Sequence, residues 1–167
     1  LAKGPSLWIF EPGCIINATA YTASDVVGDS ATAGEGAWVF RQMARIPGGR
    51  GYVVKAILDY DTAFTWSGIL YLFTKKPDGE LRDNEANTTP TIGDMGMFVG
   101  AIKFDALAEE GTGRSHSVAV PGGGQGLPLK FECRGGDDAL YGVLVVTAAF
   151  TPAAFDIIGV TLETEQL

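Results

Sequence analysis

The sequence predicts an all-β fold: an antiparallel β-sandwich with jelly-roll-like connections, in which helix is confined to short turns. At about nine places along the chain, apolar residues either alternate with polar ones or form short continuous runs. Gly, Pro, Asn and Asp separate these segments about every eight to fifteen residues, which is the turn spacing of a sandwich or barrel. With 46% hydrophobic residues, a chain of 167 residues has enough apolar material for one core.

Two neighbouring segments give the clearest strand signals. The segment 51–61 has a period of two, which is typical of a half-buried strand. The segment 69–76 is apolar on both faces at first, so we expect it to lie centrally in a sheet with both faces covered. In the first segment one face is expected to carry Tyr52, Val54, Ala56, Leu58 and Tyr60, opposite Lys55, Asp59 and Asp61.

The other candidate strands follow from the same patterns. Segment 139–150 is apolar on both faces and is predicted to be the central strand of the core, with a neighbouring subunit as one candidate cover for its outer face. In segment 157–165, Ile158, Val160 and Leu162 should point inward, opposite Thr161, Glu163 and Glu165. The remaining predicted strands are 14–20, 37–46, 67–76, 99–105, 116–120 and 129–134.

Turns and helices are predicted from Gly, Pro and capping residues. Pro47-Gly48-Gly49 and the segment 134–138 are predicted to be hairpin turns. Thr89 and Pro90 precede a predicted short helical turn. The segment 105–111 is predicted to form one or two further helical turns, closed by Gly111.

The chain shows no internal domain boundary, so residues 20–167 are predicted to form a single domain. Residues 1–19 are predicted to be an N-terminal arm or a first strand. Within them Leu7, Trp8, Ile9 and Phe10 form a concentrated apolar run that would be a sticky patch in water. We expect this run to dock on a neighbouring subunit; the alternative is that it forms the first strand of its own sandwich.

The charge and the cysteine count exclude some classes of function. The formal net charge is −8, from 20 acidic and 12 basic residues, so we do not expect direct binding to nucleic acid. Cys14 and Cys133 are expected to be buried free thiols, although a pairing between them is an alternative. The longest apolar run, 139–150, is too short to span a bilayer.

Residues that could support catalysis or bind a ligand are few. His116 is the only histidine, and no nucleophile turn accompanies it, so we predict no enzymatic activity, no cofactor and no metal. Asp83, Asn84 and Asn87 lie in a polar loop that we interpret as a contact loop or a solvated turn, with bound calcium as an alternative. The tryptophans Trp8, Trp38 and Trp66 could form a platform that stacks on sugars, but Trp38 is expected to lie in the core.

The order of these segments resembles that of a family of small structural proteins of tailed bacteriophages. The resemblance begins at 20–28 (AYTASDVVG) and continues through 56–59 (AILD), 70–73 (LYLF), the Asp83-Asn84 loop, 99–104 (VGAIKF), 140–145 (LYGVLV) and 158–163 (IGVTLE). It implies a capsid decoration or cement protein: a β-sandwich made in the host cytoplasm and located on the virion exterior. The implied partners are the major capsid protein and the chain itself, as a homotrimer or dimer.

Two other functions remain open at this stage. One is a carbohydrate-binding, lectin-like sandwich, which exposure of Trp66 beside Asp83 would support. The other is a jelly-roll domain of a fibre or receptor-binding protein, which would project outward on a stalk.

Overall fold

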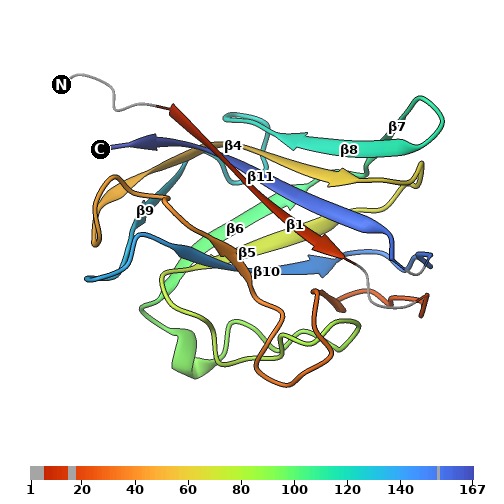
Figure 1. The fold of residues 1–167 in the computed structure, drawn as a ribbon, viewed down its shortest axis with the longest axis horizontal. Helices are drawn as coiled ribbons and strands as arrows, with labels where there is room; N and C mark the ends of the chain where they lie inside the picture. The colour runs from red at the N-terminus through yellow and green to blue at the C-terminus, as the bar shows by residue number, and fades with distance from the viewer. Residues whose placement is uncertain (1–5, 15–17, 154) are drawn as a thin grey trace.

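The structure is a computed structural model, and it describes residues 6–14, 18–153 and 155–167. Two antiparallel sheets pack face to face in a β-sandwich (Figure 1). The single helical element among the described residues is the 3-10 turn η1 (Ile92–Asp94). The predicted all-β class is therefore confirmed.

Each sheet combines strands that are far apart in the chain. The first sheet has the spatial order β1 (Ser6–Cys14), β11 (Ile157–Gln166), β4 (Arg50–Tyr60), β8 (Arg114–Ala119) and β7 (Ala108–Glu110), and β9 (Leu129–Glu132) pairs with the first residues of β4. The second sheet has the order β2 (Val26–Val27), β10 (Leu140–Val146), β5 (Gly68–Phe73) and β6 (Phe98–Phe104), and β3 (Trp38–Phe40) also pairs with β10.

This strand order is that of a jelly roll. The chain crosses between the sheets from β1 to β2, from β3 to β4, from β4 to β5, from β6 to β7, from β9 to β10 and from β10 to β11. The last strand, β11, inserts between β1 and β4, and β10 inserts between β2 and β5, which gives two interlocked Greek keys.

The predicted alternation of β11 is confirmed. Ile158, Val160 and Leu162 are fully buried between the sheets, whereas Thr161, Glu163 and Glu165 are only partly buried on the outer face. Residues of both sheets form one main hydrophobic cluster together with these three. The period of two is sufficient to orient this strand because its inner face meets a second sheet along its whole length.

The predicted face of β4 is wrong in its first half. The register against β11 shifts between Glu163 and Thr164, so Val54 is an extra residue in β4 and the strand carries a β-bulge there. As a consequence Val53, rather than Val54, is buried in the core with Ala56. Beyond the bulge, Leu58 and Tyr60 face inward as predicted.

The central position predicted for β10 is confirmed, and its cover comes from the same chain. β10 lies between β5 on one side and β2 and β3 on the other. Its outward residues Val143 and Val145 belong to a second buried cluster with Val26, Phe73 and Leu81. Loops between 28 and 37 and between 74 and 97 pass beneath this sheet (Figure 1), so no neighbouring subunit is needed to cover it.

Several local predictions are wrong because tertiary contacts overrode them. Segment 105–111 contains the short strand β7 instead of helical turns, because residues 108–110 pair with β8, and residues 105–107 are irregular. The turns at 47–49 and 134–138 are present, but each connects strands of different sheets and so neither is a hairpin. Of the predicted strands 14–20 and 37–46, residues 18–20 and 41–46 are irregular, and residues 15–17 lie outside the described residues.

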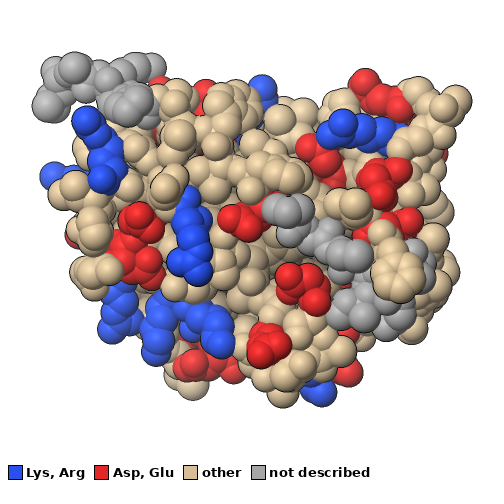
Figure 2. All heavy atoms as spheres, viewed as in Figure 1, with Lys and Arg blue, Asp and Glu red and all other residues tan. Residues whose placement is uncertain are grey.

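The charged side chains are unevenly distributed over the sandwich. In Figure 2 several Lys and Arg side chains lie toward the end of the molecule that carries β9, whereas acidic side chains predominate toward the end that carries β7. These two ends lie at opposite ends of β4, since β9 pairs with its first residues and β8 with its last.

Candidate functional site

The apolar run at the N-terminus forms part of strand β1. Residues 6–14 pair in register with β11, so the run forms the first strand of its own sandwich and not the expected docking arm. Ile9 is buried and Leu7 packs against the main core. Trp8 and Phe10 point to the outer face and remain 51% and 56% exposed.

We call Trp8, Phe10 and the neighbouring Ile157 the β1 face. The ring of Phe10 lies over Gly159, where an added Cβ atom would come within 2.4 Å of Phe10 Cε2. Ile157 is 50% exposed and lines the same shallow hollow as Phe10. The Lys55 Nζ atom lies 5.1 Å from the centre of the Trp8 ring, within the range of a cation–π interaction. The β1 face is thus an ordered aromatic surface on the outside of the first sheet.

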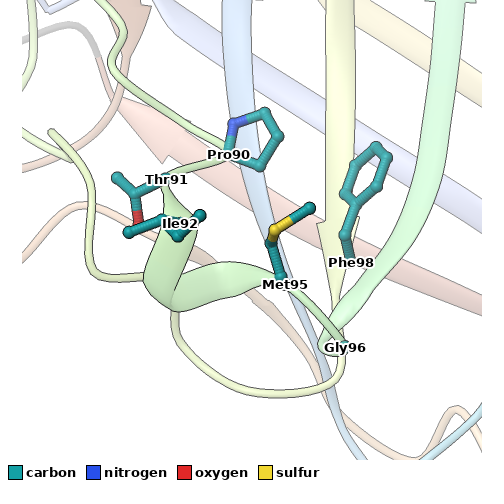
Figure 3. A pocket seen from close by; sticks show the side chains of 6 residues that line it. All are labelled: Pro90, Thr91, Ile92, Met95, Gly96 and Phe98. Carbon is teal, nitrogen blue, oxygen red and sulfur yellow. The ribbon is translucent and has the colours of Figure 1, made fainter.

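A second exposed apolar surface lies around η1, and sequence analysis did not identify it. We call Pro90, Ile92, Met95 and Phe98 the η1 patch; they line a hollow of about 470 Å³ (Figure 3). Ile92 is 88% exposed and Met95 73% exposed, the two largest exposures among the apolar residues of this surface. The segment TIGDMGMF gave a signal for a helical turn but none for which way its apolar side chains point.

The η1 patch is held in place by Asp94. This carboxylate is completely buried, and it accepts hydrogen bonds from the backbone N–H of Thr91 (2.7 Å), the Thr91 hydroxyl (3.1 Å) and the backbone N–H of Asp78 (2.8 Å). The bond from the Thr91 backbone N–H to Asp94 is one half of a capping box, in which the Thr91 side chain faces the backbone N–H of Asp94. These bonds fix the backbone of the turn from which the exposed Ile92 and Met95 side chains project.

Part of the polar loop at 83–87 holds the fold together, although Glu85 and Ala86 in the same loop are exposed. Asp83 is buried and accepts hydrogen bonds from the Tyr21 hydroxyl (2.6 Å) and from the backbone N–H of Gly28 (3.1 Å). Asn84 adopts a left-handed backbone conformation, with φ of 59°, and its side-chain amide donates to the Thr19 carbonyl.

Asn87 has a similar structural role, since its side-chain oxygen accepts bonds from the backbone N–H and the hydroxyl of Thr89. The prediction that Asp83, Asn84 and Asn87 form a surface contact is therefore corrected for Asp83, which points inward. Among the described residues, no group of three or more His, Cys, Asp and Glu side chains is arranged to hold a metal ion.

Asp83 should give the protein a measurable pH dependence. Burial raises the pKa of the Asp83 carboxyl above its ordinary value, and the hydrogen bonds from Tyr21 and Gly28 only partly oppose this. An aspartate in the unfolded chain ionises at about pH 3.9. Between that pH and the raised pKa, the folded state holds a proton that the unfolded state has released, so the free energy of unfolding falls as the pH rises.

We therefore expect Asp83→Asn to remove this decline, because Asn accepts the same two bonds without a charge. Urea denaturation between pH 3 and pH 7 should show that the stability of the wild type, relative to the variant, decreases as the pH rises. Asp78→Asn, at an exposed carboxylate, is the matched control. If the free energies of unfolding of the wild type and Asp83→Asn changed in parallel with pH, the raised pKa of Asp83 would be contradicted.

The three tryptophans do not form a common platform. Trp38 is buried, and its indole N–H donates to the Val27 carbonyl. Trp66 is only 2% exposed and stacks on Phe150, with 4.8 Å between the ring centres. Trp8 lies on the β1 face. The exposure of Trp66 beside Asp83 that would support a carbohydrate-binding sandwich is absent, because both residues are buried.

The positions of His116 and Cys133 give these two side chains little reactivity. His116 lies on the outer face of β8, with Nε2 3.5 Å from Glu110 Oε1. Cys133 is a buried free thiol, and burial raises its pKa to about 12, which keeps it protonated and unreactive at neutral pH. That the chain is not an enzyme stays a prediction.

Comparison of the chain with protein-family models, with curated proteins and with solved structures finds no significant match in any of the three. Within the described part of the chain, no helix has the length and apolar character required to cross a membrane.

Proposed function

We propose that this chain is a structural virion protein that binds the outer surface of a phage capsid. In this role it stabilises the capsid by bridging major capsid subunits, and it acts as a homotrimer or dimer. The observation that carries the proposal is the presence of two ordered, exposed apolar surfaces, the β1 face and the η1 patch, on one compact sandwich.

The β1 face has the composition of a contact surface between proteins. Aromatic side chains dominate the binding energy of such surfaces when a partner excludes water from them. Trp8 and Phe10 are on a strand whose other side chains anchor it to the core, so they are presented without a loss of conformational freedom on binding. Contiguous exposed apolar groups of this kind mark interaction sites in soluble proteins.

The η1 patch supplies the second contact that bridging requires. It precedes β6 in the second sheet, whereas the β1 face lies outside the first sheet. A protein that binds two neighbouring subunits at once gains affinity, because the second contact forms within an existing complex. This is the physical requirement for resisting forces that push capsid subunits apart.

The sequence resemblance to phage decoration proteins also supports this proposal over the alternatives. The carbohydrate-binding alternative depended on exposure of Trp66 beside Asp83, and both residues are buried. A fibre or receptor-binding protein would instead project outward on a stalk. The capsid-binding experiment described next distinguishes this alternative from a decoration protein.

The proposal predicts saturable binding to DNA-free heads of the phage that encodes the chain. Purified protein should co-sediment with expanded heads at a fixed ratio to the major capsid protein, and the loaded heads should resist heat better than bare heads. Trp8→Ala/Phe10→Ala should lower the affinity at least about 100-fold, because each aromatic contact at the centre of an interface contributes roughly 2 kcal/mol or more.

Val120→Ala is the matched control, since Val120 is also apolar and 41% exposed but lies outside both surfaces. Its binding should equal that of the wild type, and all variants should melt at the wild-type temperature. Absence of co-sedimentation by the wild-type protein would overturn the proposal. Unchanged binding by the double variant would show that the β1 face does not contact the capsid.

A further inference from the structure

The end of the sandwich near β9 is basic although the whole chain is acidic. We call Arg41, Arg45, Arg50, Lys130 and Arg134 the basic end; they are five of the 12 basic residues in the sequence. The turns that carry them lie side by side, since Gly48 N–H donates to the Asp137 carbonyl (2.7 Å) and Cys133 N–H to the Gly49 carbonyl (2.8 Å). All five side chains belong to exposed residues.

Acidic neighbours offset part of this positive charge: Glu132, Asp137 and Asp138 lie at the same end, and the charge of Arg41 acts on Glu11. None of the five forms an ion pair with a residue that the structure describes. Two acidic neighbours are already engaged: Asp137 accepts bonds from Ala139 N–H and the Tyr141 hydroxyl, and Asp138 accepts a bond from Gln42 N–H. The third, Glu132, lies opposite Arg50 across the β4–β9 pair.

The opposite end of the sandwich has the complementary charge. We call Asp61, Asp105, Glu109 and Glu110 the acidic end; all four are exposed. Two basic residues lie beside them: Lys103, two residues before Asp105, and Arg114, which is bound to Asp59 at 3.0 Å. The two ends are separated by the length of β4, about 33 Å for ten residue steps of a strand.

Each charged end also carries an exposed apolar residue. Ile46 is 66% exposed at the basic end, between Arg45 and Arg50 in the sequence, and Phe64 is 38% exposed at the acidic end, three residues after Asp61. An apolar centre with a charged rim is the common arrangement of protein interfaces.

We propose that the basic end of one copy of this chain binds the acidic end of a second copy. A second copy of the chain is the proposed partner because of charge complementarity: its acidic end is opposite in charge to the basic end. Repulsion between two copies with a net charge of −8 is screened beyond about 10 Å at 0.1 M salt, so the facing ends dominate at contact. A head-to-tail contact leaves one free end of each kind, and it closes into a ring or extends.

This inference concerns self-association of the isolated chain through a head-to-tail contact, which differs from the closed dimer or trimer of the proposed function. It does not depend on capsid binding, so the two are tested separately. Sedimentation equilibrium of the isolated protein at 0.1 M salt should show self-association that weakens as the salt is raised to 1 M, where the screening length is about 3 Å.

Charge reversal at either end should disrupt the contact, and mixing should restore it. Arg45→Glu and Glu109→Arg should each associate about tenfold more weakly than the wild type, because like charges then face each other. An equimolar mixture of the two variants should associate like the wild type, because the intact basic end of one meets the intact acidic end of the other.

Lys103→Glu is the matched control, since it changes the net charge by as much as Arg45→Glu but lies on β6 next to the acidic end. It should not weaken association. A wild-type protein that stays monomeric up to about 1 mM, the weak limit of specific binding, would overturn the inference. It would also be overturned by variants that associate as well as the wild type, or by a mixture that associates no better than its components.

Discussion

Replacing Val145 with Asp is expected to lower the free energy of unfolding by about 3–5 kcal/mol, the range for a charge buried without a partner. Val145 is 4% exposed and lies in the middle strand β10, opposite Ile69 of β5 and Val26 of β2. Its side chain belongs to the second cluster, where Phe73 and Leu81 surround it. The buried members of this cluster have only hydrocarbon side chains, so none of them can donate a hydrogen bond to a carboxylate or neutralise it.

Urea denaturation and thermal melting measure this effect directly. For a domain of this size, the expected loss lowers the melting temperature by roughly 10 °C or more. Val120→Asp introduces the same charge at an apolar position that is 41% exposed, and it should change stability by less than about 1 kcal/mol. Equal melting temperatures for Val145→Asp and the wild type would show that the covering loops do not close over β10.

Truncation of Phe150 to Ala is expected to lower the free energy of unfolding by about 3–5 kcal/mol, the range for a phenylalanine removed from a core. The Phe150 ring is stacked between Tyr21 and Trp66, with centre-to-centre distances of 5.0 Å and 4.8 Å. Tyr60 meets it edge-on at 6.2 Å, and Phe64 packs against it at a tilt. No other aromatic ring of the described residues makes as many recorded ring contacts, so its loss leaves a cavity that several neighbours must share.

The same denaturation experiment tests this assignment, with Phe155→Ala as the control. Phe155 is 75% exposed, so its truncation should change the free energy of unfolding by no more than about 0.5 kcal/mol. Phe150→Leu keeps part of the side-chain volume, so its free energy of unfolding should lie between those of Phe150→Ala and Phe155→Ala. If Phe150→Ala were as stable as Phe155→Ala, the aromatic cluster would not support this end of the sandwich.

The sequence predicted those strands whose environment is uniform along their length. β11 alternates because it packs against the second sheet on one face only, and β10 is apolar throughout because both of its faces are covered. β4 was predicted less well, because the bulge at Val54 reverses the pattern halfway along the strand. A bulge depends on the register with β11, more than 100 residues away in the sequence, so the local pattern contains no signal for it.

The candidate site was predicted less well than the fold. Loops rich in Asp and Asn are usually solvated, yet Asp83 is turned inward by Tyr21, 62 residues away. The η1 patch was missed for the opposite reason: Ile92 and Met95 are apolar, and apolar residues are expected to be buried. Their exposure is fixed by Asp94, whose three hydrogen bonds hold the turn away from the core.

The sequence by itself determined the all-β class, the position of most strands and the scarcity of catalytic groups, since these depend on residue type and on a period of two. Only the tertiary structure decided which apolar side chains remain in contact with solvent. Trp8 and Trp66 both stand beside strand-forming residues, but β1 is an edge strand whose outer face has no cover, whereas Trp66 lies beneath Phe150. Burial depends on partners brought together from distant parts of the chain, and that information is not present in a local pattern.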